Sequence, residues 1–232
     1  MKNNKSWFFI LISLSLLAGC ATTAIPKNLL DPTLSEFHNI YDYGDAQYVD
    51  GELVLQATKN WFFMTQKTYA DFILTAEVLL PDVTEYSNSG IMFRSQIRNS
   101  EKGPMAIGYQ VDIDPSDRKW TGGLFDQSRR LWLHPIHSTR SHPDEHFLLN
   151  YTPTWTTTMA NAYKHLEWNH IRIECRGNEI KIYVNDVLTT HVLDNTDAEG
   201  YIGFQHHGSK TLRETGQSNN VVRFRNINVI EF

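Results

Sequence analysis

The stretch DFILTAEVLL, residues 71–80, decides the fold, because apolar side chains stand at every second position along it. These positions share one face of an extended strand: Phe72, Leu74, Ala76 and Val78. The same period, carried by β-branched and aromatic residues, predicts strands at residues 52–56, 90–96, 108–114, 121–126, 170–176, 179–185, 200–206 and 221–232. Beyond residue 20, no segment of useful length repeats its apolar residues with a helical period. We therefore predict an all-β domain, a sandwich of two antiparallel sheets.

The beginning of the chain predicts export. Lys2 and Lys5 give a positive start, and the apolar run at residues 7–17 is too short to span a bilayer. The small residues before Cys20 resemble the lipobox of bacterial lipoproteins, in which that cysteine is acylated; an ordinary signal peptide that happens to contain a cysteine is the alternative. We expect a lipid-anchored protein of the cell envelope, in the outer membrane or facing the periplasm. The expected boundaries are a signal peptide at 1–19, a tether at 20–34 and one domain at 35–232.

Charge and cysteine content narrow the function. The formal net charge is −5 and no basic stripe is present, so we expect no nucleic-acid partner. With Cys20 attached to the membrane through its lipid, Cys175 has no cysteine in the chain to pair with. Cys175 alternates with Ile171 and Ile173, which favours a buried structural thiol over a catalytic one.

Residues 129–165 break the strand pattern. The segment is long, irregular and rich in aromatic residues and histidine, and such loops are usually functional when they are not disordered. We expect it to form one wall of a binding site, with Trp132 and His134 against the ligand. The spacing of its histidines does not match a standard metal signature, and ordinary polar loop residues are the alternative: His134, His137, His142 and His146.

Alternation also sorts the polar side chains of three predicted strands. Where the apolar residues face the core, a charged or amide set faces outward: Arg94, Gln110, Asp112, Asp114, Gln205 and His207. If these strands share a sheet, one face carries a guanidinium, carboxylates, amides and an imidazole. Such a surface suits sugar hydroxyls, and aromatic rings beside it suit sugar faces. Ordinary solvated positions of an amphipathic sheet are the alternative.

Several short blocks, in this order and spacing, resemble the 3-keto-disaccharide hydrolase domain family. They lie at residues 89–95, 108–114, 121–125, 167–169, 177–178, 184–185, 200–208 and 224–227. The resemblance covers roughly residues 35–232. It implies a concanavalin-like jelly-roll β-sandwich and a carbohydrate substrate.

The resemblance also implies a mechanism. A ketone at C3 of a sugar acidifies the C2 hydrogen, so a base removes it, the C1 substituent leaves and water adds back. On this chain Asp112 or His207 would be the base, and Arg94 would stabilise the enolate oxygen. The expected sugar-binding residues are Asp114, Gln110, Gln205, Trp132 and His134. No cofactor is assigned, and a divalent metal beside the enolate stays open.

The chain departs from the family pattern at three positions. The family commonly has Glu where Gln110 stands, Gln where Asp112 stands, and Asp where His206 stands. The carboxylate has thus moved by two positions along one strand, to the same face. Gln110 favours a rival function, a non-catalytic, lectin-like carbohydrate-binding lipoprotein, whereas Asp112 and His207 favour the enzyme. A structural envelope protein without sugar affinity is a third alternative.

Overall fold

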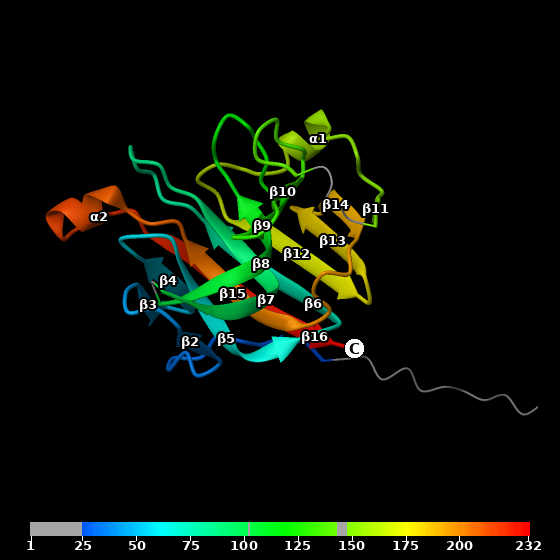
Figure 1. Cartoon of the computed structure of the whole chain (residues 1–232). Coiled ribbons are helices and arrows are strands. Elements are labelled where there is room, and N and C mark those ends of the chain that lie inside the picture. The colour runs from blue at the N-terminus through cyan, green and yellow to red at the C-terminus, as the bar shows by residue number, and fades with distance from the viewer. Residues whose placement is uncertain (1–24, 102, 143–147) are drawn as a thin grey trace, which may run out of the picture.

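Two antiparallel sheets pack face to face in the computed structural model, which describes residues 25–101, 103–142 and 148–232 (Figure 1). The signal peptide, Cys20 and His146 lie outside these residues. The seven-stranded sheet has the order β10-β9-β8-β7-β15-β5-β2. Its strands are β2 (Phe37–Asn39), β5 (Trp61–Tyr69), β7 (Ser89–Ser100), β8 (Gly103–Ile113), β9 (Leu124–Gln127), β10 (Leu131–His134) and β15 (Gly200–His206).

The nine-stranded sheet has the order β11-β14-β13-β12-β6-β16-β4-β3, and β1 also pairs with β16. Its strands are β1 (Lys27–Asn28), β3 (Asp45–Val49), β4 (Glu52–Gln56), β6 (Phe72–Leu79), β11 (Leu149–Asn150), β12 (Asn169–Arg176), β13 (Glu179–Val184), β14 (Val187–Leu193) and β16 (Val222–Glu231). Two short helices, α1 (Thr157–Ala160) and α2 (Lys210–Thr215), lie in the connections. The predicted all-β sandwich is confirmed. Within the described ranges, no helix is long and apolar enough to cross a membrane.

The core lies between the sheets, where the alternating strands predicted it. In β6, burial alternates along the whole strand, and the apolar face predicted from residues 71–80 is the buried one. Phe204 of β15 and Phe224 of β16 meet across the core with ring centroids 4.9 Å apart. Such edge-to-face pairs contribute about 0.5–1.5 kcal/mol beyond their buried area.

Strand β5 was not predicted, because its first residues, Trp61–Met64, are apolar at every position and show no two-residue period. Trp61 and Phe63 point into the core, whereas Phe62 and Met64 pack with Met92 on the opposite face of the seven-stranded sheet. That opposite face, which we call the outer face, is therefore partly apolar. It is also the face that carries the candidate site.

The domain begins earlier than residue 35. Lys27 pairs with Val229 in the nine-stranded sheet, and the Leu29 amide donates to the Ile227 carbonyl at 2.9 Å. Leu29 is fully buried. Residues 25–34, which the sequence analysis placed in the tether, are thus part of the sandwich.

Candidate functional site

A small pocket on the outer face of the seven-stranded sheet, the site pocket, brings most of the predicted site residues together. Its floor comes from β8, β9, β10 and β15, and the rest of its lining comes from the loops that follow β4, β6, β8, β10 and β15. The predicted residues that line it are Gln110, Asp112, Trp132, Gln205 and His207. The expectation that the predicted strands share one sheet and one face is confirmed for Gln110, Asp112, Gln205 and His207.

The sheet register places the floor residues in a row. Asp112 of β8 pairs with Gly90 of β7, and Gln205 of β15 pairs with Phe62 of β5. Because Phe204 pairs with Ile91, Gln205 lies beside Gly90 on the next strand. The row therefore runs from a carboxylate, over a glycine, to an amide.

Gly90 is needed because the Gln110 side chain lies directly over it. A Cβ at position 90 would come within 2.3 Å of Gln110 Nε2. From this position Gln110 Nε2 donates to Gln205 Oε1 at 3.0 Å, and Gln205 Nε2 donates to Asn60 Oδ1 at 2.7 Å. The chain of amides fixes the orientation of all three side chains across the floor.

Asp112 is a buried carboxylate with few hydrogen-bond partners. Its residue is 7% exposed, Oδ1 accepts a hydrogen bond from Asn88 Nδ2 at 3.4 Å, and Oδ2 has no partner among the described residues. Burial, followed by the charge of Asp114, raises the pKa of Asp112 to about 7. A carboxylate with such a pKa is a much stronger base than an exposed one, and it is still substantially ionised at neutral pH.

Three buried polar atoms in the site pocket lack a hydrogen-bond partner within the described parts of the chain. They are Gln110 Oε1, Asp112 Oδ2 and Trp132 Nε1. Leaving a buried polar group unpaired costs about 1–3 kcal/mol, so such groups seldom gather without a function. They belong to residues that line the pocket, and together they amount to two acceptors and one donor.

Two arginines at the pocket were missed by the sequence analysis. Arg118 pairs with Asp114, with Nη2 2.5 Å from Oδ2, and its guanidinium lies over the Trp132 ring. Arg140 lies over the Phe125 ring at 5.5 Å, and no carboxylate in the described ranges pairs with it. Both arginines lie in loops, where alternation gives no information about side-chain direction. Among the described residues, the pocket therefore contains one guanidinium with a carboxylate partner and one without.

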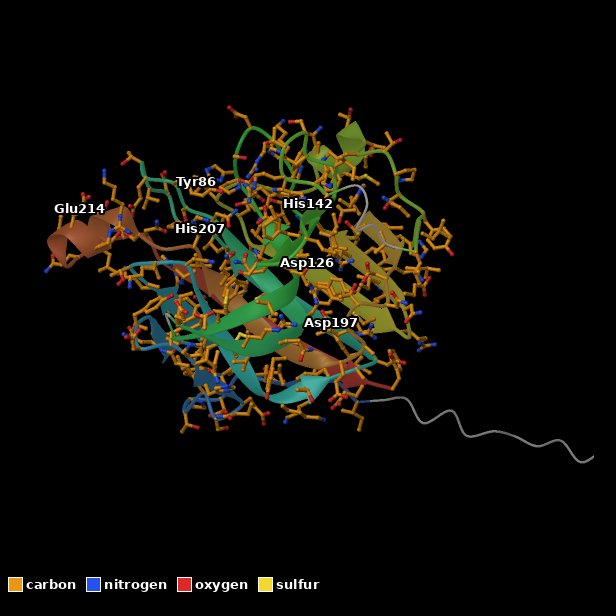
Figure 2. The ribbon with its side chains drawn as sticks, viewed as in Figure 1. Tyr86, Asp126, His142, Asp197, His207 and Glu214 are labelled. Atoms are coloured by element: carbon orange, nitrogen blue, oxygen red, sulfur yellow. The ribbon has the colours of Figure 1, made fainter. Side chains whose placement is uncertain are left out.

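His207 lies at the rim beside Tyr86, and Figure 2 shows the two at the same end of the molecule. Their rings meet edge to face, 5.2 Å apart. The His207 amide donates to the Asn88 carbonyl at 3.3 Å, which links the rim to the residue that contacts Asp112. Burial lowers the pKa of His207, so its imidazole is neutral at pH 7.

Arg94 is not in the site pocket, and the expectation that it shares a face with Asp112 is wrong. The residue has φ 45°, at a register shift between Met92 and Gln96 in the pairing of β7 with β8. This bulge reverses the alternation. The guanidinium is buried, and it donates to the Ala70 and Gly177 carbonyls at 2.8 and 2.7 Å and to Asp71 Oδ1 at 3.0 Å.

Two other predicted binding residues also lie off the pocket. His134 is buried against Trp155, with ring centroids 5.5 Å apart, and burial lowers its pKa to about 4. Asp114 is buried behind the rim, where it accepts hydrogen bonds from Ser116 and Arg118. Asp114 therefore positions Arg118 and raises the pKa of Asp112 without lining the pocket.

The long segment contributes to the pocket through Trp132 and Arg140. His137 accepts a hydrogen bond from the Thr139 amide, and His142 is exposed. In the parts of the chain that the structure describes, no three His, Cys, Asp or Glu side chains are grouped closely enough to hold a metal ion. Cys175 is buried in the core and burial raises its pKa to about 12, which fits a structural thiol.

Solved structures share the fold. The chain is similar to a protein from Parabacteroides distasonis named as a candidate glycosyl hydrolase, with 18% identity, a TM-score of 0.56, and coverage of 90% of this chain and 100% of the other. It is also similar to the carbohydrate-binding module CBM66 from Bacillus subtilis, with 14% identity, a TM-score of 0.50, and coverage of 85% and 96%. No curated protein matches the chain in sequence.

The family is shown by a match that covers nearly all of the described sandwich. Residues 26–230 match the 3-keto-alpha-glucoside-1,2-lyase-like domain. The match begins just before β1 and ends inside β16, so it spans both sheets and every strand that contributes to the site pocket. The chain belongs to the family of 3-keto-alpha-glucoside-1,2-lyase-like domains.

Proposed function

We propose that the site pocket cleaves 3-keto-glycosides by removing the C2 proton, eliminating the C1 substituent and adding water. The observation that carries the proposal is Asp112, a buried carboxylate with an unpartnered oxygen and a pKa of about 7. A general base works best when its pKa lies near the operating pH. A surface that only binds sugar hydroxyls has no need of such a base.

Asp112 takes the C2 hydrogen as a proton, and the electron pair of that bond forms the enolate of the C3 ketone. The enolate then expels the C1 substituent, whose oxygen leaves with the electrons of the C1–O bond and takes up a proton. Water adds across the resulting C1–C2 double bond, which returns a 3-keto sugar and a free alcohol or phenol.

Arg140 takes the role that the sequence analysis gave to Arg94. Its guanidinium lines the pocket without a carboxylate partner among the described residues, so it can face the negative charge that develops on the C3 oxygen. Trp132 Nε1 is a second donor without a partner. Arg118 is less suited, because Asp114 already neutralises it.

His207 is the candidate for moving a proton at the leaving oxygen. Its neutral imidazole carries one N–H and one acceptor nitrogen, so it can relay a proton: the acceptor nitrogen takes a proton from solvent as the N–H donates its own to the departing oxygen. Its place at the rim suits a group that exchanges protons with water. Gln110, Gln205 and Asn60 would orient the sugar hydroxyls from the floor.

The rival function, carbohydrate binding without cleavage, is favoured by one observation. Gln110 stands where the family commonly has Glu. The chain of amides formed by Gln110, Gln205 and Asn60 therefore contains no carboxylate. Product analysis separates the two functions. The protein is mixed with 3-keto-glucosides and with the unoxidised glucosides, and release of the C1 group is measured together with deuterium exchange at C2.

The proposed enzyme releases the C1 group of 3-keto substrates and exchanges C2 deuterium, and it leaves the unoxidised glucosides intact. Binding of both sugars without exchange or release would establish the rival. Asp117→Asn, at an exposed carboxylate near the same loop, is the matched control for Asp112→Asn. Loss of turnover in both variants would exclude a specific role for Asp112.

We also propose that the protein is held in the cell envelope by a diacylated Cys20. A single acyl chain binds membranes only marginally, so the diacyl group would be the main attachment. Cys20→Ser should release the protein from the membrane fraction or block its processing. Unchanged fractionation and an unchanged mature N-terminus would overturn the lipoprotein assignment.

A further inference from the structure

A second, larger hollow on the outer face adjoins the site pocket. Its volume is about 600 Å³, against about 90 Å³ for the site pocket, and both are lined by Asn60 and Gln127. We call it the side pocket. Pockets of 300–1,000 Å³ are the usual size for small-molecule ligands, so the side pocket can hold a group that the site pocket cannot.

The side pocket is walled by aromatic rings whose polar atoms are already bonded. The Tyr41 hydroxyl accepts from the Ala106 amide at 3.2 Å, and the Tyr43 hydroxyl donates to the Asn60 carbonyl at 2.8 Å. The two rings lie 5.3 Å apart. Phe62 of β5 also lines the hollow and packs in the apolar cluster of the outer face. With both hydroxyls engaged, Tyr41 offers ring surface to a ligand, whereas Lys59 Nζ already lies over the Tyr43 ring, 4.9 Å from its centroid.

Each of the two amides shared by the pockets has one of its polar atoms engaged. Gln127 Nε2 donates to Ser128 Oγ at 3.0 Å, and Asn60 Oδ1 accepts from Gln205. Pro104 and Met105 extend the apolar part of the wall. The wall also contains the Asp42 carboxylate and the Ser128 hydroxyl. Its rings suit a flat apolar group, because aromatic pairs gain about 0.5–1.5 kcal/mol beyond burial.

Another hollow adjoins the site pocket on the other side, and its chemistry differs. It shares Asn60, Tyr86 and His207 with the site pocket, and its wall includes the charged residues Lys59, Glu85, Lys210 and Arg213. These charged groups suit a polar group. The site pocket thus adjoins one hollow lined by aromatic rings and one lined by charged side chains.

We propose that the side pocket receives the leaving group of the substrate and that this group is aromatic, so that aryl 3-keto-glycosides are the preferred substrate class. This inference rests on the proposed function. The aryl group lies against Tyr41 and Phe62, while the sugar lies over the amides of Gln110 and Gln205. After elimination it departs as the phenol.

The test uses a ratio that cancels the intrinsic reactivity of the leaving group. kcat/KM is measured for 3-keto-glucosides of 2-naphthol, methanol and glucose, with wild type, Tyr41→Ala and Tyr41→Phe. The ratio of variant to wild type is then compared between substrates. Tyr41→Ala should reduce the naphthyl value about tenfold more than the methyl value, while Tyr41→Phe, which keeps the ring, should leave this difference within about twofold.

Tyr183→Ala is the matched control, because Tyr183 is a half-buried tyrosine of β13 in the nine-stranded sheet, away from both pockets. Equal losses on the naphthyl and methyl substrates with Tyr41→Ala would overturn the inference. An equal Tyr41 dependence for the glucosyl leaving group would make the occupant a second sugar. A naphthyl preference that survives Tyr41→Ala would place the aryl group elsewhere.

Binding separates failure of this inference from failure of the proposed function. Calorimetry with unoxidised 2-naphthyl and methyl glucosides requires no turnover. If no 3-keto substrate is cleaved, a naphthyl preference in binding that Tyr41→Ala abolishes still supports the aryl site. If that preference is absent or insensitive to Tyr41, the aryl site is overturned whether or not the protein is an enzyme.

Discussion

Asp112 and Asp194 are both buried carboxylates, 7% and 2% exposed, in very different surroundings. Asp194 lies 2.7 Å from Arg130 Nη1 and also accepts from the Tyr109 hydroxyl and from the Thr196 amide. Burial alone would raise the pKa of Asp194, but these hydrogen bonds hold it below its ordinary value. Asp112 has one long hydrogen bond and a raised pKa.

The difference separates a carboxylate that stabilises the fold from one that is available for chemistry. Asp194, with Arg130 and Asp126, joins the end of the nine-stranded sheet to the seven-stranded sheet. Its lone pairs are occupied by protein donors. Asp112 keeps an oxygen without a partner in the described chain, and its charged form is destabilised. Burial is therefore no guide to role unless the hydrogen-bond partners are counted as well.

The largest expected effect is on turnover by Asp112→Asn. Replacement of a general base typically costs a hundred- to ten-thousand-fold in rate, and we expect a loss in this range for both C2 deuterium exchange and release of the C1 group. Binding of the 3-keto-glycoside should persist, because Asn keeps the shape. C2 deuterium exchange at the wild-type rate would show that Asp112 is not the base, and it would move that role to His207.

The next effect is on stability, from Asp194→Asn. Breaking a buried ion pair costs about 3–5 kcal/mol, and we expect the lower end because Arg130 retains Asp126. Urea unfolding at pH 7 measures the loss, and turnover of the folded fraction should stay near the wild-type value. A loss below about 1 kcal/mol would show that this buried carboxylate is as weakly coupled to the fold as Asp112.

A smaller effect is expected from Arg140→Gln. Loss of one donor to a developing oxyanion costs a hundred- to a thousand-fold in well-formed sites, and we expect about ten- to a hundredfold in kcat because Trp132 Nε1 remains. Arg94→Gln, by contrast, should lower the unfolding free energy and leave kcat of the folded protein within about twofold. The opposite pattern would restore the role that alternation gave to Arg94.

The smallest effect is the dependence of stability on pH. The folded pKa of Asp112, about 7, lies above its ordinary value of 3.8. The folded state therefore binds more protons than the unfolded state between these values, and Asp112 makes wild type lose stability as pH rises through this window. Asp112→Asn should become more stable than wild type by at least about 1 kcal/mol at pH 8, with no gap below pH 4. Parallel curves would mean that Asp112 is not destabilised by burial.

Local pattern predicted most of the sandwich and half of the site. β4 and β15 have the bounds that the alternation of their apolar residues gave. β5 was missed because Trp61–Met64 are apolar at every position and therefore show no two-residue period. Arg94 was misplaced because one bulge changes the face of a side chain, and Arg118 and Arg140 were missed because loops carry no period. Strand register, which places Asp112 in a row with Gln205, depends on contacts distant in sequence.

The absence of a side chain at Gly90 has a consequence for how the protein can change. Because the Gln110 side chain occupies the space above Gly90, position 110 can exchange its amide for the equally large carboxylate of Glu with no movement of the main chain. Gln110→Glu alone would therefore add a second carboxylate to the floor of the site pocket, while the main chain of the floor stays as it is. Gly90→Ala would close this route by displacing whichever side chain stands at position 110. Gly90 thus leaves room for either an amide or a carboxylate at position 110.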